Sequence, residues 1–145
     1  MTAAHAVAFR AELLGWPGVV RTIAVADDQT LEQLHEALRI AFGWADPHLY
    51  SFWPSGKFQD GDEYTTPWGL EERGANAKGA DIPIAELELE LGKGKKIAYL
   101  FDYGDEWRVT LEVVDTWEIE DGAYPMLIEA EGAAPPQYPP LDEDD

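Results

Sequence analysis

The sequence predicts an α+β fold, in which a mixed and mostly antiparallel sheet packs against one main helix and short helical segments. Two segments, 6–26 and 97–114, repeat apolar residues at every second position, and this period is typical of β-strands. Another segment, 30–42, has instead the spacing of a helix with one buried face. The length of 145 residues suits one ordinary domain, so the sequence predicts a single core.

Residues 6–14 and 18–26 are predicted to form a β-hairpin. The stretch between them, 14–18, reads LGWPG and combines glycine with proline, which favours a turn. Alternate residues share one face of each predicted strand: Val7, Phe9, Ala11 and Leu13 on the first, and Val19, Arg21, Ile23 and Val25 on the second. Both the period and the turn chemistry therefore suit an antiparallel pair.

Residues 30–42 are predicted to form the main helix. Thr30 has the side chain of an N-cap, and Gln33 stands where the second member of a capping box belongs. Gly43 suits the left-handed conformation that ends many helices. His35 borders the apolar stripe of this helix, so we expect it at the edge of the core. The stripe consists of Leu31, Leu34, Leu38, Ala41 and Phe42.

The middle and the end of the chain have weaker patterns. Residues 48–53, HLYSFW, predict an aromatic strand, and 63–67, EYTTP, predict a short strand within a long excursion over 55–80. Residues 82–91 fit either a strand or, over IAEL, a short helical turn. Residues 124–131, YPMLIEAE, predict a last strand.

The stretch 99–114, YLFDYGDEWRVTLEVV, is predicted to form a second β-hairpin. Alternating apolar residues flank the turn-forming Gly104, and Asp and Gly are common turn residues for local reasons. The two acids beside the glycine, Asp102 and Asp105, therefore have a structural interpretation. A second interpretation stays open at this point, because two acids near a turn can also bind a cation or act as acid and base.

The composition excludes several classes of protein. The formal charge is −19, from 29 acidic and 10 basic residues, which disfavours direct binding to nucleic acid and suits a soluble surface or a basic partner. The sequence has no cysteine, which excludes disulfides, thiolate metal sites and cysteine nucleophiles. No apolar run reaches the roughly 18 residues of a membrane span. Because the N-terminus does not read as a secretion signal, we expect a cytoplasmic protein.

The end of the chain has a composition of its own. No lysine or arginine follows Arg108, and the last 37 residues hold 11 acids. We therefore predict a single domain over 1–132 and a Pro-rich acidic tail over 133–145 that is extended or disordered. The alternative is a docking segment built from Tyr138 and Leu141.

Six residues form a candidate polar and aromatic binding cluster: His35, His48, Tyr50, Asp102, Asp105 and Trp107. Imidazole and carboxylate suit zinc, manganese or iron, so the two histidines and two aspartates would make a metal site if they converged. A histidine beside an apolar stripe is more often a hydrogen-bonded boundary residue. The sequence therefore assigns no catalytic residue, no metal ligand and no cofactor. Trp107 is expected in the core, whereas Trp53 and Trp68 fit a core or a binding surface.

Three segments taken together resemble the plasmid pRiA4b ORF-3-like family, which is also described in bacteria as an insertion-sequence passenger protein of TnpR type. These segments are 30–52, 99–113 and 124–136, and their most specific pieces are Leu34-His35, GW followed by HLY, and DYGDEW. The resemblance spans about residues 6 to 136 and implies an α+β domain. It implies no known reaction, because the family is functionally uncharacterised. This chain departs from the family pattern at Val109 and Ala134, where the family often has histidine and cysteine.

Three functional hypotheses follow. The leading one is a non-enzymatic binding or interaction module with an unknown partner, for which a protein is one candidate. The second is a small metal-dependent hydrolase that uses His35, His48, Asp102 and Asp105. The third is an acidic accessory protein that engages a basic partner linked to mobile DNA.

Overall fold

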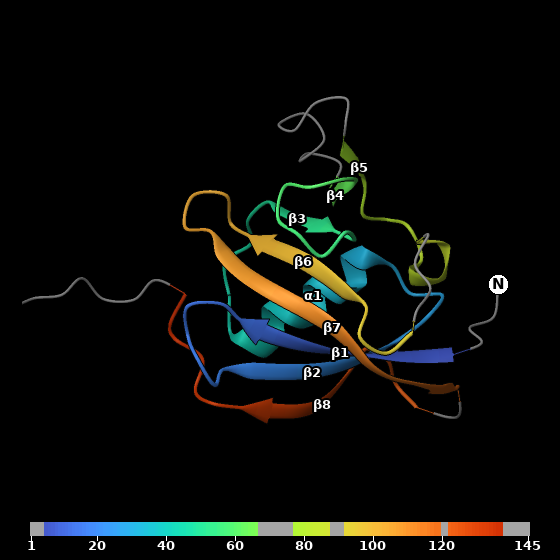
Figure 1. The fold of residues 1–145 in the computed structure, drawn as a ribbon. Coiled ribbons are helices and arrows are strands. Elements are labelled where there is room, and N and C mark those ends of the chain that lie inside the picture. The colour runs from blue at the N-terminus through green and yellow to red at the C-terminus, as the bar shows by residue number, and fades with distance from the viewer. Residues whose placement is uncertain (1–4, 67–76, 88–91, 120–121, 138–145) are drawn as a thin grey trace, which may run out of the picture.

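The computed structural model describes residues 5–66, 77–87, 92–119 and 122–137. These residues form one mixed eight-stranded sheet, one α-helix and one 3-10 helix (Figure 1). The sheet order is β5-β4-β3-β6-β7-β1-β2-β8, and only β4 and β5 pair in parallel. The strands are β1 (His5–Leu13), β2 (Val20–Ala26), β3 (Tyr50–Trp53), β4 (Glu63–Thr65), β5 (Ala77–Gly79), β6 (Lys96–Phe101), β7 (Trp107–Glu118) and β8 (Met126–Glu131). The helices are α1 (Leu31–Phe42) and the 3-10 helix η1 (Ile84–Glu86).

Both predicted hairpins are confirmed. β1 pairs antiparallel with β2, and β6 pairs antiparallel with β7. The two hairpins join because β1 also pairs with β7, which places β1 between β2 and β7. In the register of these pairs, Phe9 lies opposite Ile23 on one side and Val113 on the other, so three strands contribute buried side chains to one row of the core.

The predicted helix is also confirmed, with both of its ends. Thr30 and Gln33 form the reciprocal capping box, and Gly43 ends the helix at a φ of 79°. Leu31, Leu34, Leu38 and Phe42 are buried in the main core, and Ala41 is partly buried against it. α1 packs nearest to β2 and β8, on one side of the sheet.

The expectation of a sheet packed against one main helix overstates the part that the helix plays in this fold. The described residues are mostly sheet, and α1 covers only part of one face. A second, smaller core of Trp53, Ala98 and Leu100 forms on β3 and β6. Along β6, Ala98 and Leu100 alternate with Ile97, Tyr99 and Phe101 of the main core, so this smaller core lies on the face away from α1.

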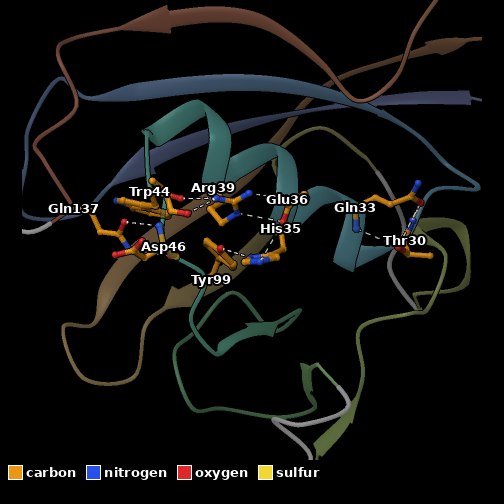
Figure 2. A network of polar contacts seen from close by, with 10 residues as sticks. Thr30, Gln33, His35, Glu36, Arg39, Trp44, Asp46, Tyr99 and Gln137 are labelled. Carbon is orange, nitrogen blue, oxygen red and sulfur yellow. Dashed lines mark hydrogen bonds and ion pairs between the residues drawn. The ribbon is translucent and has the colours of Figure 1, made fainter.

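The weakly patterned segments gave mixed results. The short strand expected at 63–67 is β4, and the helical alternative within 82–91 is realised as η1, whereas residues 88–91 lie outside the described residues. β5 had no counterpart in the prediction. Residues 133–137 have no regular secondary structure, but the Gln137 side chain exchanges two hydrogen bonds of 3.0 Å with the backbone of Asp46 (Figure 2). The proposed docking residues Tyr138 and Leu141 lie outside the described residues.

Candidate functional site

His35 is held at the centre of the helix face that looks toward β3 and β6. Its position follows from the capping box, which fixes where α1 begins, and from the buried Leu34 and Leu38 on either side of it in sequence. The ring is buried, and its Nδ1 lies 2.7 Å from the phenolic oxygen of Tyr99 on β6 (Figure 2). Because an α-helix turns by about 100° per residue, the His35 ring lies at the border of the apolar stripe of α1.

Burial decides the protonation state of this pair. It lowers the pKa of His35 to about 4, so the imidazole is neutral at neutral pH. Burial likewise raises the pKa of Tyr99 well above its ordinary value, so its phenol keeps its proton. Within the described residues Tyr99 has no other acceptor for that proton, which favours donation from Tyr99 Oη to His35 Nδ1. His35 then bears its own proton on Nε2, 3.9 Å from the Glu36 carboxylate.

Tyr50 on β3 packs against the ring of His35. Its ring stacks on the His35 ring, with centroids 3.6 Å apart and an interplanar angle of 12°. The side chain is 1% exposed, and among the described residues its phenolic oxygen has no hydrogen-bond partner. Burial first, and then the negative charges of Glu32 and Glu36, raise the pKa of Tyr50, so the phenol is neutral. A buried hydroxyl without a partner is uncommon, because it forfeits its bonds to water.

A pocket of about 400 Å³ opens beside this stack. Its lining comes from the first half of α1, the segment before β3, the first residue of β3 and the residue after β4: Glu32, Gln33, His35, Glu36, Pro47, His48, Tyr50 and Thr66. This lining contains two carboxylates and no lysine or arginine. The pocket therefore combines an acidic rim with two neutral, stacked aromatic rings.

The two acids of the rim are in different states. Glu36 is bound by the Arg39 guanidinium through two hydrogen bonds, and this pairing is the main reason that the pKa of Glu36 is lowered. Arg39 also donates to the carbonyl oxygens of Trp44 and Ala45, at 2.7 and 3.1 Å (Figure 2). It thereby ties α1 to the loop that leads to His48. The Glu32 carboxylate makes no ion pair within the part of the chain that the structure describes.

His48 and Asp102 form a second polar pair at the edge of the pocket. His48 Nε2 lies 3.5 Å from Asp102 Oδ2, and the His48 ring meets the Phe101 ring edge-on at 5.7 Å. Since the backbone N–H of Asp102 donates to the carbonyl of Leu49 at 2.8 Å, the loop before β3 and the end of β6 are held together at this point.

The contacts of Asp102 are those of a turn residue. Its Oδ1 accepts hydrogen bonds from the backbone N–H groups of Gly104 and Asp105, at 3.0 and 3.3 Å, and its φ of 69° is in the left-handed region that Asp tolerates. Asp105 contributes its backbone N–H to this turn, not its carboxylate. The structural interpretation of the hairpin acids is therefore the one that the geometry supports.

Two of the remaining aromatic candidates, Trp107 and Trp53, lie in the core. Trp107 is 8% exposed, with its ring 5.7 Å from that of Trp44 and 6.3 Å from that of Trp16. Trp53 is buried in the smaller core, next to Phe58. Trp68 lies outside the described residues.

The structure thus brings three of the six predicted residues into one pocket, namely His35, His48 and Tyr50. Asp102 adjoins them through His48, whereas Asp105 and Trp107 belong to the turn and the core. The four ligands of the hydrolase hypothesis do not form one cluster: no group of three or more His, Cys, Asp or Glu within the described ranges is placed to hold a metal ion. His35 is also committed to Tyr99 through Nδ1.

The prediction missed Glu32 and Tyr99. A signal for Glu32 was present, because it precedes His35 by three residues, a spacing that puts two side chains on the same face of a helix. Tyr99 had no such signal, since its contact with His35 joins α1 to β6 across 64 positions of sequence.

Comparison with known proteins places the chain in a family. Residues 6–138 match the plasmid pRiA4b ORF-3-like protein family, and the chain belongs to this family, as its motifs predicted. The chain is 31% identical over 127 residues to an uncharacterised protein of Sinorhizobium fredii; the match covers 83% of this chain and 59% of that protein.

A solved structure has a similar fold. It is a protein of unknown function from Methanosarcina mazei Go1, with a TM-score of 0.76 and 21% sequence identity, over 94% of this chain and 74% of that one. The names of both relatives state no activity. Among the described residues, no helix is long and apolar enough to cross a membrane.

Proposed function

We propose that this protein is a non-enzymatic binding module, and that the pocket beside α1 takes the ammonium group of a small organic amine. The observation that supports this most directly is the buried phenolic oxygen of Tyr50, which has no partner among the described residues. The Tyr50 residue lines an acidic pocket. An ammonium nitrogen that donates to Tyr50 Oη satisfies this oxygen.

The charges of the pocket support a cationic ligand. Glu32 lines the pocket, and within the described residues it is in no ion pair, so it is available to offset a positive charge. Burial keeps His35 neutral, with a pKa of about 4, so the imidazole does not oppose a cation at neutral pH. The lining carries no Lys or Arg to compete for the site. Desolvated aromatic faces favour organic cations further.

The hydrolase hypothesis receives less support from the geometry. His48 and Asp102 form an imidazole–carboxylate pair at the pocket, but His35 and Asp105 are directed to other contacts. We therefore keep a binding role as the conclusion, and a cytoplasmic location as a proposal that rests on the composition.

The test is calorimetric titration with three small probes of similar size. Butylammonium has a charge and N–H donors, tetramethylammonium has the charge alone, and 1-butanol has a hydroxyl without charge. We expect butylammonium to bind most tightly, because the proposed site needs both a donor and a positive charge.

Two substitutions assign the binding to the pocket. Tyr50→Phe is expected to weaken butylammonium binding about tenfold, the effect of one lost hydrogen bond in a desolvated site. Glu32→Gln is expected to reduce the preference for butylammonium over 1-butanol. The matched controls are Tyr64→Phe on β4 and Glu118→Gln at the end of β7, neither of which lines this pocket. The proposal would be overturned if Tyr50→Phe bound butylammonium as tightly as the wild type does. It would also be overturned if the wild type bound 1-butanol more tightly than butylammonium.

A further inference from the structure

β8 is an edge strand with an apolar surface. It ends the sheet order, and among the described strands it pairs only with β2. All six of its residues are exposed, including the successive apolar residues Met126, Leu127 and Ile128. The free edge of such a strand presents backbone N–H and C=O groups that another chain can pair with.

One of these residues, Ile128, has no partner in the register between β8 and β2. Ile23 pairs with Leu127 and Thr22 pairs with Glu129, so Ile128 has no opposite residue on β2. This irregularity is a β-bulge, a feature that commonly occurs at sheet edges. Ile128 is 49% exposed, which leaves an apolar side chain at the sheet edge in the middle of the strand.

An apolar groove of about 380 Å³ lies between β8 and α1. Leu127 forms one wall and Ile40, which is 68% exposed, forms the other. Pro125, Ile23, Ala37 and Ala41 complete the apolar lining, while Gln33 and Glu36 line both this groove and the amine pocket. The unpaired edge and the groove are therefore adjacent, as strand addition with a side-chain anchor requires.

The charges near this surface select the occupant. Glu129 and Glu131 are exposed on β8 itself, whereas Glu36, which borders the groove, is already paired with Arg39. The whole chain carries a formal charge of −19. A second copy that paired with β8 would bring these glutamates close to their own counterparts, whereas a lysine- or arginine-bearing segment would complement them.

We propose that β8 and the groove beside it dock an extended segment of a basic partner protein. The segment adds a strand to the free edge of β8 and inserts one apolar side chain between Leu127 and Ile40. Its Lys or Arg side chains lie beside Glu129 and Glu131. This surface shares Gln33 and Glu36 with the amine pocket, but the two proposals are tested with different probes and variants.

The test uses a synthetic probe peptide of alternating lysine and valine, which has the period of a strand and the complementary charge. Its affinity for the full chain is measured by fluorescence anisotropy, and its position by amide chemical-shift changes in NMR. Two further peptides keep the sequence but carry N-methyl groups on alternate residues, one in each register. The N-methylated peptides keep their full charge, and each loses the backbone N–H donors along one of its two edges.

We expect the unmodified peptide to shift the amides of β8 and one N-methylated peptide to bind about tenfold more weakly, because it loses donors to the β8 carbonyls. Glu129→Lys/Glu131→Lys should also weaken binding about tenfold. The matched control, Asp60→Lys/Asp62→Lys, makes the same change in charge near β4, toward the opposite edge of the sheet, and should leave most of the affinity.

Ile40→Glu separates groove binding from general attraction between opposite charges. It makes the protein more acidic, so attraction alone predicts tighter binding of a basic peptide, whereas the proposal predicts weaker binding because one wall of the groove is lost. Ile40 is exposed, so the fold is not at risk. Tighter binding by Ile40→Glu, or equal binding of all three peptides, would overturn the proposal. So would a dimer of this chain that the peptide dissociates, since it would assign the edge to a second copy.

Discussion

His35 is a histidine that the fold keeps neutral. Its ring is stacked on Tyr50, hydrogen-bonded to Tyr99 and largely removed from water, and burial is the main cause of its lowered pKa. Glu36 opposes this shift and Arg39 adds to it, but both are smaller effects than burial. The protonated form is thus much less favourable in the folded state than in the unfolded chain.

This difference predicts a pH dependence of stability. The folded-state pKa of His35, about 4, lies below the ordinary histidine pKa of 6.5, so the unfolded chain binds the proton first as the pH falls. The free energy of unfolding should therefore fall by about 2 kcal/mol between about pH 7 and about pH 5 from this group alone. Urea unfolding of the wild type and of His35→Gln measures it. In the variant, the free energy of unfolding should depend less steeply on pH over this range. An identical pH dependence in both proteins would contradict the burial of a neutral imidazole.

The sequence predicted the residues of the pocket only in part. His35 is placed correctly by helical spacing, because its position beside the stripe of Leu34 and Leu38 follows from local geometry. The stacking of His35 on Tyr50 could not be predicted, because it depends on how α1 sits over β3. The missing partner of Tyr50 is a property of the whole environment of that oxygen, which no local pattern encodes.

The hairpin of β6 and β7 shows what local patterns determine well. The period fixed both strands, and the turn chemistry fixed where they reverse. Asp102 supports the reversal with a side-chain oxygen that accepts two backbone N–H groups and with a backbone in the left-handed region. The segment 82–91 shows the opposite case, because the same alternation fits a strand and the observed η1, and only tertiary contacts decide between them.

A substitution series at this turn separates shape from charge. Asp102→Asn keeps an accepting oxygen and the tolerance of positive φ, so we expect a loss of about 1 kcal/mol or less. Asp102→Ala removes both and should cost about 1–3 kcal/mol. Asp105→Asn is the control, because only the backbone of Asp105 enters the turn. Urea unfolding gives all three values. If Asp102→Asn costs as much as Asp102→Ala, the charge opposite His48 stabilises the fold and the turn interpretation is incomplete.

At the scale of the whole molecule, the sequence patterns could not predict the order of the strands in the sheet. Each hairpin was predictable, but the pairing of β1 with β7 that joins them involves residues about a hundred positions apart. The short β5 also escaped prediction, because its three residues, AKG, have no strand pattern and pair only through their neighbour β4. The resemblance to a known family was visible in the motifs and predicted the fold class; it could not predict a ligand.

The C-terminal segment gives a prediction at this scale. Pro135 and Gln137 are buried, and Gln137 binds the backbone of Asp46 in the loop that leads to the pocket. Deleting residues 138–145, which are mostly acidic or proline, should leave the melting temperature nearly unchanged. Deleting 133–145 should instead lower the free energy of unfolding by about 1–3 kcal/mol, because two hydrogen bonds to a buried amide are lost. Equal stability of the two truncated proteins would show that the docking of Gln137 contributes nothing.

The central claim is that Tyr50 keeps a buried hydroxyl for a ligand and not for the fold. The most direct measurement is the free energy of unfolding of the wild type and Tyr50→Phe, with and without butylammonium. Without the amine, we predict that Tyr50→Phe is as stable as the wild type or more stable, because the lost oxygen had no partner. With the amine, the wild type should gain more stability than Tyr50→Phe at the same amine concentration, because the variant binds the amine about tenfold more weakly. A Tyr50→Phe variant that is less stable by more than about 1 kcal/mol, or one that gains as much from the amine as the wild type, would contradict the account.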